Sequence, residues 1–259
     1  MIGNKEKGIV LQDRDHRVLR ELGKMRVADR ELIKCAAGFG STTRANSRLL
    51  ALTRAGLLRR FYIGTTAGGK KALYALSLNG AKVAQVPFRG PRRESEKVLV
   101  ADFFVTHQLE LNRIYCTLAY PSIPVPGVRF LRWMNFSESV APGFALIPDG
   151  YVEVATPGKT LSAFLEVDLG HESRSVWRKK VEQYLNLALS GAFAQRFGQS
   201  QFRVLAVTNS ERRMESLRVA TAAITEKIFW FSTLEEIDGK GFWSPIWLRP
   251  KGTDLLRLW

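Results

Sequence analysis

Three segments in the second half of the chain decide its fold: IPDGYVEV at 147–154, FLEVDLG at 164–170 and WRKKVEQYL at 177–185. The first two are short and rich in β-branched and aromatic residues, which is typical of strands. The third belongs to a longer stretch with apolar residues at helical spacing. Strands that alternate with helices predict an α/β core with some parallel pairing.

The same pattern extends on both sides of these segments. Residues 144–147 and 151–154 flank Pro148-Asp149-Gly150, and a turn is expected there. The other predicted strands are 128–134, 161–169, 202–207 and 228–232, and the predicted helices are 172–189 and 212–224.

Carboxylates gather beside these strands. Glu166 and Asp168 share one strand face because side chains alternate along a strand, and Asp149 precedes the neighbouring strand. Carboxylates from adjacent strands are typical ligands of Mg²⁺. Ion pairs with Arg174 and Arg178 would explain the same charges, and the sequence leaves both interpretations open.

The positive charge is concentrated in the first part of the chain. The protein has 39 Lys and Arg against 24 Asp and Glu in 259 residues. Residues 1–97 hold 21 basic and 8 acidic residues, a net charge of +13, whereas residues 98–259 carry only +2. This asymmetry favours a nucleic-acid-binding module followed by a nearly neutral domain.

Residues 13–88 predict three short helices and a hairpin. The expected helices are 13–24, 27–37 and 42–54, the last capped by Ser41 or Thr42, and the expected strands are 57–63 and 72–78. The segments LLALTRAGLLRRFYIG (49–64) and ALYALSLNGAKVA (72–84) resemble the third helix and wing of bacterial winged helix-turn-helix domains.

That resemblance implies contact with double-stranded DNA. The start of the third helix would reach base edges through Thr43, Arg44, Ser47 and Arg48. The phosphates would be contacted by Arg59, Arg60, Lys70 and Lys71. A winged helix that binds only protein is the alternative.

A connector separates the two predicted domains. The stretch PFRGPRR (87–93) is typical of a linker, residues 94–118 predict one long helix, and YPSIPVPG (120–127) ends it. We therefore expect a DNA-binding domain at 1–90, a connector at 91–127 and an α/β domain at 128–259. The long helix would pack on a domain or pair two subunits.

The carboxylate pattern resembles the PD-(D/E)XK nuclease-like fold. Pro148-Asp149 and Glu166 match its acidic positions, but Asp168 stands where that family has a lysine. Lys180 on the following helix would supply the cation in its place. The resemblance implies Mg²⁺ or Mn²⁺ at Asp149, Glu166 and Asp168 with Lys180 as a catalytic cation, or a scaffold that has lost cleavage.

The whole arrangement, including HQLELNRIY at 107–115, resembles the replication-relaxation family of mobile-element proteins. This implies a homodimeric, duplex-specific DNA-binding accessory factor for replication, transfer or transcription control, working with other mobile-element proteins. A metal-dependent endonuclease or nickase and a protein-interaction adaptor are the alternatives.

The remaining features concern location and packing. No apolar run approaches the ~18 residues of a membrane span, and the start of the chain lacks an apolar signal block, so a cytoplasmic protein without membrane contact is expected. Cys35 and Cys116 lie far apart in sequence and fit neither a disulfide framework nor a zinc site. The aromatic tail, which includes Trp230, Trp243, Trp247 and Trp259, would pack in a core or stack on bases.

Overall fold

The computed structural model describes residues 9–64, 68–89, 103–120, 123 and 125–258. The chain divides into two compact units, Met1–Cys116 and Thr117–Trp259. Both units combine helices with a β-sheet, so the protein has an α+β fold, as the sequence predicts. No helix in the described ranges has the length and apolar character needed to cross a bilayer.

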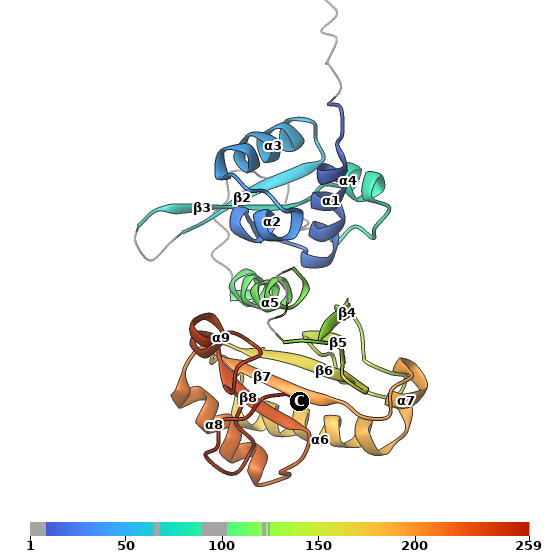
Figure 1. The fold of residues 1–259 in the computed structure, drawn as a ribbon, viewed down its shortest axis with the longest axis vertical. Helices are drawn as coiled ribbons and strands as arrows, with labels where there is room; N and C mark the ends of the chain where they lie inside the picture. The colour runs from blue at the N-terminus through green and yellow to red at the C-terminus, as the bar shows by residue number, and fades with distance from the viewer. Residues whose placement is uncertain (1–8, 65–67, 90–102, 121–122, 124, 259) are drawn as a thin grey trace, which may run out of the picture. The chain divides into compact units, whose positions relative to one another are not determined.

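In the first unit, helices come first and a hairpin follows (Figure 1). The elements are α1 (Asp13–Met25), β1 (Ala28–Asp29), α2 (Arg30–Ala37), α3 (Thr42–Arg54), β2 (Leu58–Gly64), β3 (Lys70–Leu76), α4 (Leu78–Ala84) and α5 (Phe103–Ala119). The sheet has the order β1-β3-β2 and is antiparallel throughout. The apolar stripe of α1, formed by Val18, Leu19 and Leu22, is buried in the core of the unit.

Two boundaries differ from the prediction because capping side chains reset them. Helix α2 starts at Arg30 rather than Val27, since the Asp29 carboxylate accepts a hydrogen bond from Leu32 N and Ala28–Asp29 pairs with β3. Strand β3 ends at Leu76 because Ser77 caps α4 through Gly80 N, 2.9 Å away. The sequence analysis missed α4, whose seven residues carry a weak periodic signal.

Helix α5 packs within the first unit. Asn112 Nδ2 donates to Met25 O (3.0 Å) and Val27 O (2.7 Å), and Tyr115 donates to Glu21 Oε2 at 2.7 Å. These contacts end the α1 turn by satisfying buried carbonyl groups. The predicted long helix agrees from Phe103 onward, and its residues 94–102 lie outside the described ranges.

The fold also brings the two cysteines together. Cys116 on α5 lies 4.0 Å from Leu32 O of α2, and its thiol hydrogen-bonds to Cys35, one turn further along α2. Their separation in sequence therefore misled the analysis of the cysteines. Cys35 is exposed and Cys116 is buried.

The second unit is built on a five-stranded sheet of order β4-β5-β6-β7-β8. Its strands are β4 (Arg129–Met134), β5 (Gly150–Thr156), β6 (Lys159–Asp168), β7 (Arg203–Thr208) and β8 (Phe229–Thr233). The first three strands run antiparallel, and β6, β7 and β8 are parallel. The predicted mixture of strand–helix–strand order and parallel pairing is confirmed.

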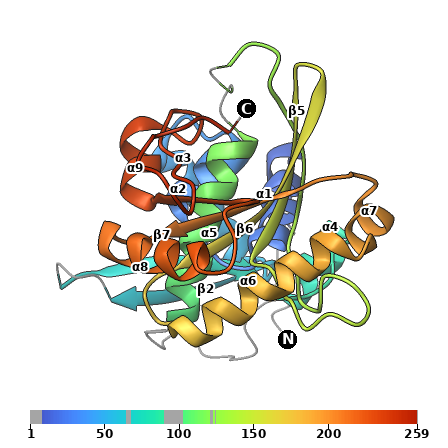
Figure 2. The same ribbon diagram turned by 90° about the horizontal axis from the view of Figure 1, so that it is seen from below.

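Helices cover the sheet and complete its core. They are α6 (Arg174–Leu189), α7 (Ala192–Phe197), α8 (Glu211–Ala222) and α9 (Leu234–Lys240). Figure 2 shows α6 running along one face, and residues of α6, α7 and α8 share one apolar cluster with that face of the sheet. The short helices α7 and α9 were not predicted. Residues 144–147 form no strand; they lead into the PDG turn.

Two details explain sequence features of this unit. Gly150 begins β5 because a Cβ there would lie 2.6 Å from Cζ2 of the Trp133 ring. The described aromatic residues of the tail pack inside the fold: Trp230, Trp243 and Trp247 are all buried. Burial removes these rings from base stacking, and Trp259 lies outside the described ranges.

Candidate nucleic-acid interface and acidic cluster

The start of α3 presents an exposed polar face. Ser41 caps the helix by accepting a hydrogen bond from Arg44 N, which leaves Thr43, Arg44 and Ser47 exposed. These three side chains line a surface hollow of about 360 Å³ together with Arg14 of α1. Arg14 lies over the Phe39 ring, with its Cζ 5.0 Å from the ring centre. The sequence analysis did not include Arg14 in the interface, although its position on the polar side of α1 was the signal.

Arg48 has a structural task instead of the base contact predicted for it. Its guanidinium binds both carboxylate oxygens of Asp15, with Nε 2.6 Å from Oδ1, and donates to Val10 O at 2.7 Å. Asp15 is fully buried. Burial raises the pKa of Asp15, but the hydrogen bonds from Arg48 and Gln12 N outweigh it and hold the pKa below its usual value. The guanidinium is thus committed to joining α3 to α1.

The hairpin residues also differ in availability. Arg59 and Arg60 are half-buried and lie over the rings of Phe61 and Tyr62, at 5.2 and 5.4 Å. Lys71 forms an ion pair with Asp29, the cap of α2. Lys70 is exposed at the described end of β3.

In the second unit, Glu166 is the centre of a buried polar cluster. Its side chain is almost fully buried, with Oε1 2.5 Å from the Tyr184 hydroxyl and Oε2 2.9 Å from Lys180 Nζ. Lys180 also lies 2.9 Å from Glu172 Oε1. Asp149 accepts a hydrogen bond from Val167 N at 2.8 Å. The fold therefore brings Asp149, Glu166 and Lys180 together.

The charges in this cluster are strongly coupled. Burial raises the pKa of Glu166 to about 7 against the opposing effect of Lys180, and the charge of Asp149 adds to the rise. Burial alone would lower the pKa of Lys180, but Glu166, Asp149 and Glu172 raise it above the usual value. Lys180 therefore stays charged, and its ion pair is the main compensation for the buried carboxylate.

Asp168 belongs to a separate ion pair. Arg213 of α8 donates to both of its oxygens, from Nε at 3.0 Å and Nη2 at 2.5 Å, and Gly170 N donates to Oδ1 at 2.6 Å. Because β6 and β7 are parallel, Asp168 pairs with Thr208, and α8 begins just after that point. Arg213 was not predicted, although the helix start after a parallel strand was its signal. Arg174 and Arg178, the predicted partners, do not fill this role.

This arrangement does not fit a divalent cation. Both oxygens of Glu166 and both oxygens of Asp168 already accept hydrogen bonds from protein groups. Within the described ranges, no group of three or more His, Cys, Asp or Glu side chains is placed to hold a metal ion. A metal would have to displace Lys180 or Arg213 from a buried carboxylate, which costs several kcal/mol by the usual measure of broken buried pairs, roughly 3–5.

Comparisons with known proteins bear on the whole chain. No curated protein and no solved structure matches it. The family model described as replication-relaxation matches residues 19–201, a range that runs from α1 to the segment before β7 and covers more than half of the chain. On this match the protein belongs to the replication-relaxation family.

Proposed function

Membership of the replication-relaxation family points to a role in replication or mobile-element processes. We propose that this protein is a duplex-DNA-binding accessory factor of a mobile element, which acts in replication, transfer or transcription control. In this proposal the first unit is a winged helix-turn-helix domain. The second unit is a nuclease-like scaffold that does not cleave.

The exposed start of α3 is the observation that carries the proposal. Helices that read the major groove place residues near their N-terminus against base edges, and Thr43, Arg44 and Ser47 occupy that position. Arg14 borders the same hollow and Lys70 is exposed on the hairpin, so both would contact phosphates. The net charge of +13 over residues 1–97 supports a polyanionic partner.

The neutralised carboxylates support a scaffold without nuclease activity. Lys180 and Tyr184 saturate Glu166, while Arg213 saturates Asp168. One feature favours the alternative of a metal-dependent endonuclease: Lys180 contacts Glu166 beside Asp149, which is where a displaced family lysine would lie. Cleavage assays separate these two functions, as described in the Discussion.

The proposal is tested by direct binding of duplex DNA. Fluorescence anisotropy with a labelled duplex should show an affinity that falls steeply between about 50 and about 200 mM salt, by about tenfold or more. A footprint of the DNA bound across the host genome would then identify the target sites. If the protein is a homodimer, footprints should contain two half-sites about 10 base pairs apart, centre to centre. Failure to bind duplex DNA at low salt would contradict the proposal.

A further inference from the structure

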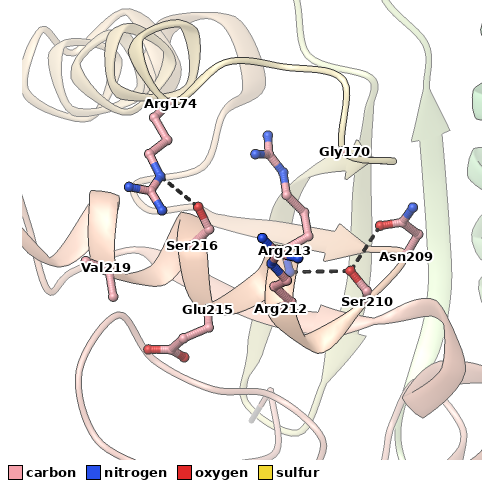
Figure 3. Close-up of a pocket in the computed structure, with 9 residues that line it drawn as sticks. All are labelled: Gly170, Arg174, Asn209, Ser210, Arg212, Arg213, Glu215, Ser216 and Val219. Atoms are coloured by element: carbon pink, nitrogen blue, oxygen red, sulfur yellow. Dashed lines mark hydrogen bonds between the residues drawn. The ribbon is translucent and has the colours of Figure 1, made fainter.

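A basic hollow lies between α6 and α8 in the second unit, and neither the acidic cluster nor the α3 interface uses it. Its volume is about 750 Å³. Figure 3 shows the side chains around it, which come from the loop after β6, the start of α6 and the first turns of α8. The polar ones are Arg174, Asn209, Ser210, Arg212, Arg213 and Ser216.

The hollow has an excess of positive charge. Three arginines line it against one acid, Glu215. The Glu215 carboxylate pairs with Arg218 at 2.6 Å and points away from Arg213 in Figure 3. Arg213 is held by Asp168, which leaves Arg174 and Arg212, both exposed, as the cations open to a ligand.

The surrounding groups favour an anion with several acceptor oxygens. Arg174 Nε donates to Ser216 Oγ at 3.0 Å, which orients its guanidinium across the hollow (Figure 3). Ser210 caps the twelve-residue helix α8, and the positive end of the helix dipole adds to the field there. Guanidinium groups bind phosphate oxygens in a bidentate manner. An open basic surface hollow suits the backbone of a polymer better than an enclosed small molecule.

We propose that this hollow binds a backbone phosphate of DNA, so that the second unit makes a DNA contact of its own. The inference rests on the proposed function, because it needs a protein that binds DNA. It gives the nuclease-like scaffold a role that does not require cleavage. Arg174 and Arg212 would hold the phosphate, while Arg213 fixes the first turn of α8 through Asp168.

The test compares two double variants of the full chain. Arg174→Ala with Arg212→Ala removes both open cations, whereas Arg178→Ala with Lys179→Ala removes the same charge from exposed positions of α6 outside the hollow. Duplex affinity is measured by anisotropy over a range of salt. We expect the first variant to lower the slope of log K against log salt by about 2 and the second to leave it nearly unchanged.

Each outcome decides a different point. If wild type binds duplex and the two variants behave alike, the hollow is not a DNA contact. If wild type binds no duplex, the proposed function fails, and this inference fails with it. A third arm uses inorganic phosphate in a thermal-shift assay. Stabilisation of wild type but not of the Arg174→Ala/Arg212→Ala variant, with unchanged duplex binding, would overturn the DNA contact in favour of a free phosphate compound.

Discussion

Lys180 Nζ lies 2.9 Å from Glu166 Oε2, and the carboxylate is 1% exposed. The lysine comes from α6, whereas the residue two positions along the strand, Asp168, is paired with Arg213 of α8. Each carboxylate at the end of β6 is therefore neutralised by a cation from a different helix. These two ion pairs attach α6 and α8 to the sheet, which gives the carboxylates a structural role that does not depend on a metal.

Replacing Lys180 by methionine should destabilise the second unit. The buried Glu166 would lose its cation, and broken buried pairs cost about 3–5 kcal/mol. The pKa of Glu166 is already raised by burial, and without Lys180 it would rise further. A carboxyl group with a raised folded-state pKa loses stability as pH rises from its usual value through the folded value. The loss should therefore be larger at about pH 8 than at about pH 5.

Urea unfolding of the full chain at the two pH values measures this effect. Lys179→Met is the matched control, because Lys179 is exposed on the same helix. Equal stabilities of the Lys180→Met variant and the control would show that the ion pair does not hold α6 to the sheet.

Divalent cations should neither stabilise the protein nor support cleavage. Ligands that bind the folded state raise its melting temperature, and the carboxylates are already saturated by protein donors. We expect no change in melting temperature with Mg²⁺ or Mn²⁺ at about 10 mM, where a site with a Kd near 0.1 mM would add about 2.7 kcal/mol. Supercoiled plasmid should remain intact under the same conditions. Nicking that requires Mn²⁺ and disappears in Asp149→Asn would establish the endonuclease alternative.

The sequence predicted the framework of this unit well and its pairings poorly. The strand before Glu166 and the helix around Lys180 follow from local apolar patterns, and the observed β6 and α6 match them closely. The partner of Asp168 depends on where α8 begins relative to β6, which only the parallel order of β6 and β7 determines. The predicted partners Arg174 and Arg178 were nearer in sequence but lie on another helix.

Arg48→Ala should reduce stability more than it affects specific contacts with DNA. The variant leaves the buried carboxylate of Asp15 without its cation, at a cost of roughly 3 kcal/mol. The pKa of Asp15 lies below its usual value, so the stabilisation is present above the ordinary range of Asp and is lost as pH falls through the folded-state value. Thermal unfolding at neutral and acidic pH checks both points. Arg44→Ala is the control, with a change within about 0.5 kcal/mol expected for an exposed residue.

The first unit shows the same limit of sequence analysis. Helical spacing correctly placed Thr43, Arg44 and Ser47 on the exposed side of α3. Arg48 lies one turn further along that side, so periodicity alone could not separate it from them. Its partner Asp15 lies on α1, and only tertiary packing brings the two side chains together.

Cys35 should react as an activated thiol. The hydrogen bond with Cys116 lowers the pKa of Cys35 to about 7, although burial opposes the shift, and burial and the same contact raise the pKa of Cys116. Cys116→Ala removes the hydrogen bond, so the pKa of Cys35 should return toward about 8.5. The alkylation rate at about pH 7 should then fall about threefold, since the smaller thiolate fraction is partly offset by higher nucleophilicity. Peptide mass spectrometry with iodoacetamide measures the rate, and an unchanged pH profile would contradict the predicted contact.

Duplex affinity of Arg44→Ala, compared with Arg20→Ala, tests the central claim most directly. Arg44 lies on the proposed recognition face of α3, whereas Arg20 is equally exposed on α1 outside the hollow, and both variants lose one positive charge. We expect Arg44→Ala to weaken binding of the footprinted target by about 1–3 kcal/mol and to narrow its preference over unrelated duplex. Arg20→Ala should change the affinity little. Equal affinities of the two variants for the target would contradict recognition of DNA by α3.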